Sequence, residues 1–215
     1  MRELGRFSPE INKVMKMPLE FSPQAVQFLT SLFEGLCYMA TLRLMEDNPA
    51  VKKDQLASLE REIGKWFFVC RNIAKQNSSI KNKMKAYLPD LMFNYYWHTY
   101  QALARMASLY GEKHEAEVTK GFIGIQCGYL REMKLLMKTL EKQDHITKEG
   151  KNMLKEAWKS AEPLANEVEQ KIREIYKCEV PQGEQLTFIE EWQSKIPDME
   201  PKNIRVPPED AQYFA

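Results

Sequence analysis

The fold class is decided by residues 88–116, which read LPDLMFNYYWHTYQALARMASLYGEKHEA. Apolar side chains recur in this stretch every three or four residues, as at Leu91, Ala102 and Met106, and this spacing places them on one face of a helix. Gly111 predicts the end of that helix, because glycine readily adopts the backbone conformation that closes a helical C-terminus. The stretch therefore predicts a long helix, a turn and the start of a second helix.

The predicted turn is similar to that of a tetratricopeptide-like hairpin. Small residues such as Ala104, Ala107 and Ser108 let two helices cross closely, and Gly111 makes the turn. A tetratricopeptide array would repeat the pattern about every 34 residues, and the chain contains one copy. We therefore expect a single tight hairpin rather than a repeat array.

A long helix is predicted to begin at Ser22-Pro23, where serine can cap the helix and proline suits its first position. It should end near Asp47. Its apolar residues recur at helical spacing: Ala25, Leu29, Leu32, Phe33, Leu36, Cys37, Ala40 and Leu44. A second helix should follow Asn48-Pro49 and run to about Gln76, with an apolar face through Trp66-Phe67.

The third helix should begin near Ser78, with a kink or break near Leu88 because Pro89 lacks a backbone donor. We expect the fourth helix over about 112–142 and the fifth from between Asp144 and Thr147 to about Lys177, kinked at Pro163. No stretch alternates apolar and polar residues as a strand would. The sequence therefore predicts an all-α array of antiparallel helices with short connections.

Residues 179–215 differ in character from the rest of the chain. Several prolines interrupt them, so we expect an extended C-terminal strap that packs on a helical body formed by residues 22–178, within one domain over 1–215. The strap has apolar anchors to bury: Leu186, Phe188, Ile189, Trp192, Ile196 and Ile204. It carries eight acidic and three basic side chains, against 22 acidic and 28 basic in the rest. We expect the acidic strap partly to neutralise the surface of the basic body.

Composition excludes several classes of protein. The formal net charge of +1 argues against nucleic-acid binding, which usually needs a basic excess. The apolar runs are too short to predict a membrane span of about 20 residues, and the N-terminus lacks the apolar core of a secretory signal. The four cysteines are far apart, so we expect reduced, mostly buried thiols in a cytoplasmic protein rather than disulfides.

An enzyme is not predicted. The three histidines share no metal-ligand spacing with one another or with the cysteines, so we expect no metal and no cofactor. A catalytic pair of Cys127 with His98 or His114 has no local sequence signature. The glycines at 121, 124 and 128 are better explained by close helix packing than by a phosphate loop, because no strand precedes them. Aromatic residues 95–100 favour core packing over base stacking, since basic neighbours are missing.

One charged patch stands out along the chain. No acidic residue interrupts the five basic side chains Arg71, Lys75, Lys81, Lys83 and Lys85. At the join of two helices they would form a basic surface able to meet an acidic membrane or an acidic partner. The simpler interpretation is an ordinary solvated turn.

The order of these elements resembles the later half of the Bro-one domain, the Alix-type endosomal adaptor domain. Four segments carry the resemblance: Phe21-Ser22-Pro23-Gln24-Ala25 at a helix start, the amphipathic helix through Trp66-Phe67, Tyr110-Gly111-Glu112 at the hairpin turn, and Ile175-Tyr176-Lys177-Cys178-Glu179-Val180-Pro181 at the exit from the last long helix. The family domain begins with a small sheet and further helices. The sequence is therefore expected to be a fragment or a shortened relative.

The resemblance implies a non-enzymatic adaptor that binds the C-terminal amphipathic helix of an ESCRT-III-type partner during endosomal sorting. Such domains accept the helix on a hydrophobic patch. The matching positions here are Leu42, Leu56 and Leu59, which would otherwise be ordinary core residues. It also implies a cytoplasmic protein that associates with endosomes. Two alternatives are a generic tetratricopeptide-like interaction module and a membrane-surface binder acting through the basic residues.

Overall fold

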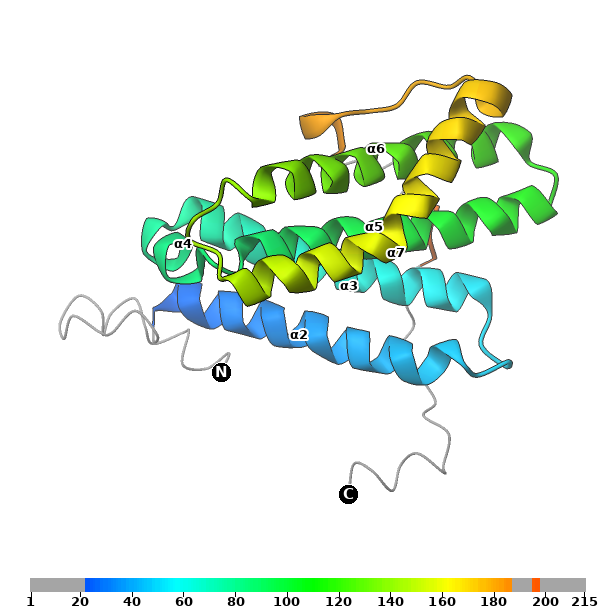
Figure 1. The fold of residues 1–215 in the computed structure, drawn as a ribbon. Helices are drawn as coiled ribbons and strands as arrows, with labels where there is room; N and C mark the ends of the chain where they lie inside the picture. The colour runs from blue at the N-terminus through cyan, green and yellow to red at the C-terminus, as the bar shows by residue number, and fades with distance from the viewer. Residues whose placement is uncertain (1–21, 187–194, 198–215) are drawn as a thin grey trace.

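The computed structural model describes residues 22–186 and 195–197, and within them the chain is helical without a strand. Its long helices pack against one another (Figure 1). The elements are α2 (Pro23–Glu46), α3 (Lys53–Gln76), α4 (Ser78–Met84), α5 (Leu88–Glu112), α6 (Ala116–Leu140) and α7 (Lys148–Lys171), followed by a π-helical turn, η2 (Ile172–Tyr176), and a 3₁₀ turn, η3 (Gly183–Leu186). The all-α prediction is confirmed.

The starts of the helices follow the capping residues in the sequence. The Ser22 hydroxyl accepts a hydrogen bond from the Ala25 amide at 3.2 Å, with proline at the first turn of α2. Asn77 caps α4 in the same way, and Thr147 caps α7. Pro89 lies in the first turn of α5, where its missing N–H costs no helical hydrogen bond. The predicted third helix is therefore two helices, with a break at residues 85–87, just before the proline.

The hairpin turn differs from the prediction in one detail. Gly111 lies inside α5, which continues to Glu112. His114 takes the positive φ of 61° that lets the chain turn into α6, although non-glycine residues rarely adopt this conformation. The predicted turn is present, but the glycine does not make it.

The last long helix reaches Tyr176, in agreement with its predicted end near Lys177, but its last turn is π-helical. α7 contains Pro163 and changes direction near its middle (Figure 1), as the proline predicts. After Lys171 the helix widens into the π-helical turn, which closes at Lys177 with a φ of 47°. The Lys177 amide donates to the Ile172 carbonyl at 2.7 Å.

α2, α3, α5 and α6 lie in chain order from one side of the molecule to the other, and α7 runs across them from beside α2 to α6 (Figure 1). α3 packs between α2 and α5, α6 packs on α5, and α7 packs on α6 (Figure 1). The core follows these contacts, and its largest fully buried side chains include Leu59, Ile63, Leu103, Phe122 and Tyr129. Because α2 lies at the edge of this arrangement, one of its faces is left outside the core.

The C-terminal segment returns along α6. Gly124 and Gly128 let it approach: a Cβ at Gly124 would lie 2.8 Å from the Glu179 carbonyl oxygen, and one at Gly128 would lie 2.6 Å from that of Pro181. These two glycines therefore serve close packing, as predicted, but against the C-terminal segment. Leu186 and Ile196 are each 2% exposed. The other predicted anchors, Phe188, Ile189, Trp192 and Ile204, lie outside the described residues.

Candidate functional site

The three leucines predicted to bind a partner lie in the hydrophobic core. Leu42, Leu56 and Leu59 are 5%, 7% and 1% exposed, and all three belong to the main core cluster. A partner helix could reach them only by opening that core. The prediction that they form a surface patch is therefore wrong, and the alternative interpretation as core residues is correct.

A different apolar surface lies on α2. We define the outer face of α2 as Phe33, Leu36, Cys37, Ala40 and Leu44, all exposed. Phe33 and Leu36 are 52% and 44% exposed, and Leu44 is 40% exposed. Their spacing of three and four residues places them on one stripe of the helix. An exposed stripe of this kind indicates a binding surface more often than scattered apolar residues do.

This stripe belongs to the pattern that the sequence predicted for α2. The residues that α2 buries form another face: Ala25, Val26, Phe28, Ser31, Gly35, Leu42 and Met45. α2 is thus apolar on two sides, and spacing alone does not tell which side faces inward. By length and composition α2 could also cross a membrane, contrary to the prediction of no candidate span. Core helices of soluble proteins meet the same criteria, so this adds no argument for a membrane.

A cleft of about 450 Å³ lies beside α2, between α2, α5 and α7. Apolar side chains such as Met39 and Trp97 line it together with Arg43 and Gln101. Two ionisable groups that also line it, Glu60 and His98, are only 2% and 6% exposed. The cleft therefore combines apolar walls with a buried polar floor.

The floor of the cleft is part of a charged network. His98 Nδ1 lies 2.5 Å from Glu60 Oε2, and Arg105 Nη2 donates to Glu60 Oε1 at 3.3 Å and to Glu46 Oε1 at 2.6 Å. Burying a carboxylate is costly unless it is paired, and here two partners satisfy Glu60.

This network was not predicted from the sequence. Its one signal is the position of Glu60, an acidic residue next to the apolar face of α3 formed by Leu56, Leu59 and Ile63. Among the described residues, no hydroxyl or thiol is hydrogen-bonded to His98, and no cluster of three or more His, Cys, Asp or Glu side chains could hold a metal ion. The network therefore joins α2, α3 and α5. Within the described residues it does not have the arrangement of a catalytic triad.

The predicted basic surface lies at the end of α3 and along α4. Lys75, Lys81, Lys83 and Lys85 are exposed, whereas Arg71 is half-buried. The Arg71 guanidinium lies 5.9 Å from the centre of the Phe68 ring. Arg71 and Lys75 also line a second cavity of about 450 Å³ together with Tyr95, Tyr96 and Glu132. The structure thus exposes the lysines, and it turns the two α3 residues toward a cavity that contains a carboxylate.

The cysteines are only partly as predicted. All four are free thiols; Cys70 and Cys127 are buried, Cys178 is half-buried and Cys37 is exposed on the outer face of α2. Burial raises the pKa of Cys70 to about 12, so this thiol stays protonated and unreactive at neutral pH. Cys127 also has its pKa raised by burial. Neither thiol has the environment of a nucleophile.

The aromatic residues of α5 pack as predicted. Tyr95 and Tyr100 are each 5% exposed. The Tyr95 ring centre lies 5.1 Å from that of Tyr96 and 5.9 Å from that of Tyr129 on α6. The cluster is part of the helix packing between α5 and α6.

Comparisons with known proteins do not assign a family. No protein-family model matches the chain, and no curated protein matches it. The resemblance to the Bro-one domain therefore stays a prediction based on the residues quoted above. The strongest candidate for a functional surface is the outer face of α2.

Proposed function

We propose that this protein is a non-enzymatic adaptor that binds an amphipathic helix on the outer face of α2. The observation that carries the proposal is the exposed stripe from Phe33 to Leu44 on a helix at the edge of the fold. Apolar anchors repeated at helical spacing over three turns fit the apolar face of another helix. Cys37 and Ala40 are small residues at the middle of the stripe, so a partner helix can approach closely there.

The resemblance to the Bro-one domain supports a more specific partner. It favours the C-terminal amphipathic helix of an ESCRT-III-type subunit and a role in endosomal sorting. The predicted surface near Leu42 moves, in this proposal, to the exposed side of the same helix. The charged side chain of Arg43 is exposed and precedes Leu44, and such a charge at the rim would help to set the register of the bound helix.

The test is a titration of labelled ESCRT-III-type C-terminal peptides into the full chain, followed by fluorescence anisotropy. We expect binding in the micromolar range. Phe33→Asp and Leu36→Asp should each weaken it at least tenfold, because each places a charge in the apolar contact. Leu135→Asp is the matched control, since Leu135 is 54% exposed but lies on α6.

Two results would contradict the proposal. One is an absence of binding below millimolar peptide concentration. The other is binding that the two α2 substitutions and the Leu135→Asp control affect equally, with all variants folded by circular dichroism.

A second candidate function is binding to an anionic membrane surface through the basic residues. The exposed lysines of α4 favour it, together with Tyr87, which is 63% exposed just after them. Such binding would weaken with salt. Sedimentation with anionic vesicles at low salt tests it: Lys81→Glu with Lys83→Glu should abolish sedimentation. No sedimentation of the unaltered chain would dismiss this candidate.

A further inference from the structure

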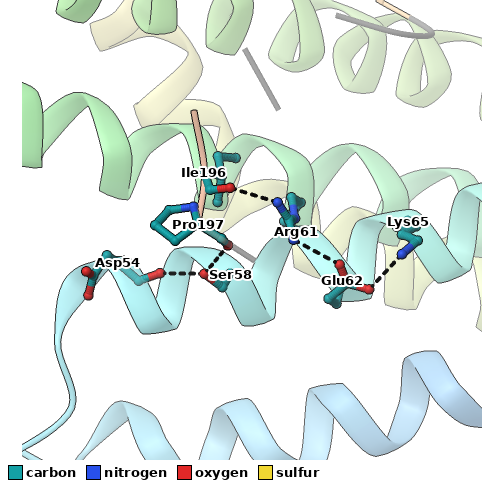
Figure 2. Close-up of polar contacts among 7 residues, drawn as sticks. All are labelled: Asp54, Ser58, Arg61, Glu62, Lys65, Ile196 and Pro197. Carbon is teal, nitrogen blue, oxygen red and sulfur yellow. Dashed lines mark hydrogen bonds and ion pairs between the residues drawn. The ribbon is translucent and has the colours of Figure 1, made fainter. Parts of the chain in front are cut away.

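Two residues of the C-terminal segment are bound by side chains of α3. Figure 2 shows Ser58 and Arg61, one turn apart, pointing at the backbone of Ile196 and Pro197. Arg61 Nη1 donates to the Ile196 carbonyl at 2.8 Å, and the Ser58 hydroxyl donates to the Pro197 carbonyl at 2.7 Å. Two consecutive backbone carbonyls thus accept hydrogen bonds from two side chains that lie more than 130 residues away in sequence.

The Arg61 side chain is held in place for this contact. Its Nη2 lies 3.2 Å from Glu62 Oε1, and Lys65 Nζ lies 3.1 Å from the other Glu62 oxygen (Figure 2). The side chains of Arg61 and Glu62 are 14% and 12% exposed, so water screens this pair little. A fixed, charged donor makes a stronger hydrogen bond to a carbonyl than a neutral one does.

Ser58 can exchange partners. Its hydroxyl lies 2.9 Å from the Asp54 carbonyl, the usual helical partner of a serine, as well as near Pro197. A hydroxyl has one proton to donate, so the two carbonyls share it. When Pro197 leaves, Ser58 keeps a partner within its own helix, and the empty surface has no unsatisfied serine hydroxyl.

The bound segment itself has a simple chemical pattern. Ile196 is 2% exposed, while Pro197 is exposed. The chain turns at Lys195 and bends at Ile196. Among the described residues, recognition therefore uses one buried apolar side chain and the carbonyls of Ile196 and Pro197.

We propose that this face of α3, defined by Ser58 and Arg61, is a binding site for a peptide that carries an apolar residue followed by proline. The chain's own Ile196-Pro197 occupies the site in cis. Because the segment is part of the same chain, it competes for the site at an effective concentration in the millimolar range. A separate peptide therefore binds measurably only when Ile196-Pro197 has left the site. The site lies on α3 and does not involve the outer face of α2, so it stands or falls independently of the proposed function.

The experiment uses the full chain and a labelled peptide with the sequence of residues 192–200, WQSKIPDME. Ile196→Asp in the protein should release the segment, because a carboxylate does not enter the apolar position. We expect the peptide to bind this variant at least tenfold more tightly than the unaltered chain. Adding Arg61→Ala to Ile196→Asp should remove the gain.

Lys65→Ala is the matched control, since Lys65 lies one turn further along α3 and its ammonium group is paired with Glu62 rather than with Ile196 or Pro197. It should keep most of the binding. If Ile196→Asp does not fold, Ile196→Ala supplies a milder release. The proposal is overturned if the peptide binds neither released variant, or if its binding is unchanged by Arg61→Ala.

Discussion

At the scale of single residues, Glu60 is a buried carboxylate with two charged or polar partners. It is an acidic side chain at 2% exposure, and its two oxygens face His98 and Arg105. A buried carboxylate contributes to stability only while its partners stay in place. Arg105 also contacts Glu46, whose side chain is 44% exposed. The same arginine therefore offers a comparison between a buried and an exposed partner.

Glu60→Gln should lower the free energy of unfolding by about 3 kcal/mol, because it leaves the buried Arg105 contact without its charge. Glu46→Gln should cost less than about 1 kcal/mol, since water already screens that contact. Urea unfolding at neutral pH measures both. Equal losses in the two variants would show that the buried network does not determine stability.

At the scale of elements, α6 shows how a helix makes room for a returning chain. Gly124 and Gly128, one turn apart, lie under the carbonyls of Glu179 and Pro181. Next to them, the Tyr129 hydroxyl donates to the Leu186 carbonyl at 2.7 Å. The cost of two glycines inside a helix, about 1 kcal/mol each, is offset by this packing.

Gly128→Ala should lower the free energy of unfolding by about 1–3 kcal/mol. The new Cβ would lie 2.6 Å from the Pro181 oxygen, a backbone atom that cannot move without shifting the segment. Gly111→Ala is the matched control, because the nearest atom to its Cβ would be 4.0 Å away. That variant should gain up to about 1 kcal/mol from helix propensity. Thermal unfolding compares both variants with the unaltered chain. A Gly128→Ala variant as stable as the unaltered chain would contradict the packing argument.

These elements show what could be predicted from sequence. Caps and prolines located several helix boundaries, because Ser22, Pro23 and Pro89 act through local hydrogen bonds and local sterics. The inward face of α2 was not predictable, since both its faces are apolar and only the position of α3 decides between them. The partners of Glu60 and Arg61 lie in segments far along the chain. The spacing of residues within one helix cannot predict such contacts.

At the scale of the whole molecule, a tyrosine cluster connects the helices with the C-terminal segment. The hydroxyls of Tyr95 on α5 and Tyr129 on α6 lie 3.4 Å apart, and Tyr129 reaches the segment at Leu186. The ring centre of Tyr96 lies 6.1 Å from that of Tyr129. Because α5, α6 and the segment meet here, the ionisation of these phenols affects the unfolding of the entire chain.

This connection predicts a loss of stability at alkaline pH. Burial, with the nearby Glu132 carboxylate, raises the pKa of Tyr96 to about 12, and burial also raises the pKa of Tyr95 and of Tyr129. In the unfolded chain a tyrosine loses its proton near pH 10. Between about pH 10 and 12 the unfolded state therefore binds fewer protons than the folded state, and the free energy of unfolding falls as pH rises.

The substitution Tyr96→Phe should make this fall in the free energy of unfolding with pH shallower. Urea unfolding of both proteins across this range measures it, and comparison at equal pH cancels the lysine titration that they share. Parallel curves would mean that Tyr96 ionises alike in the two states.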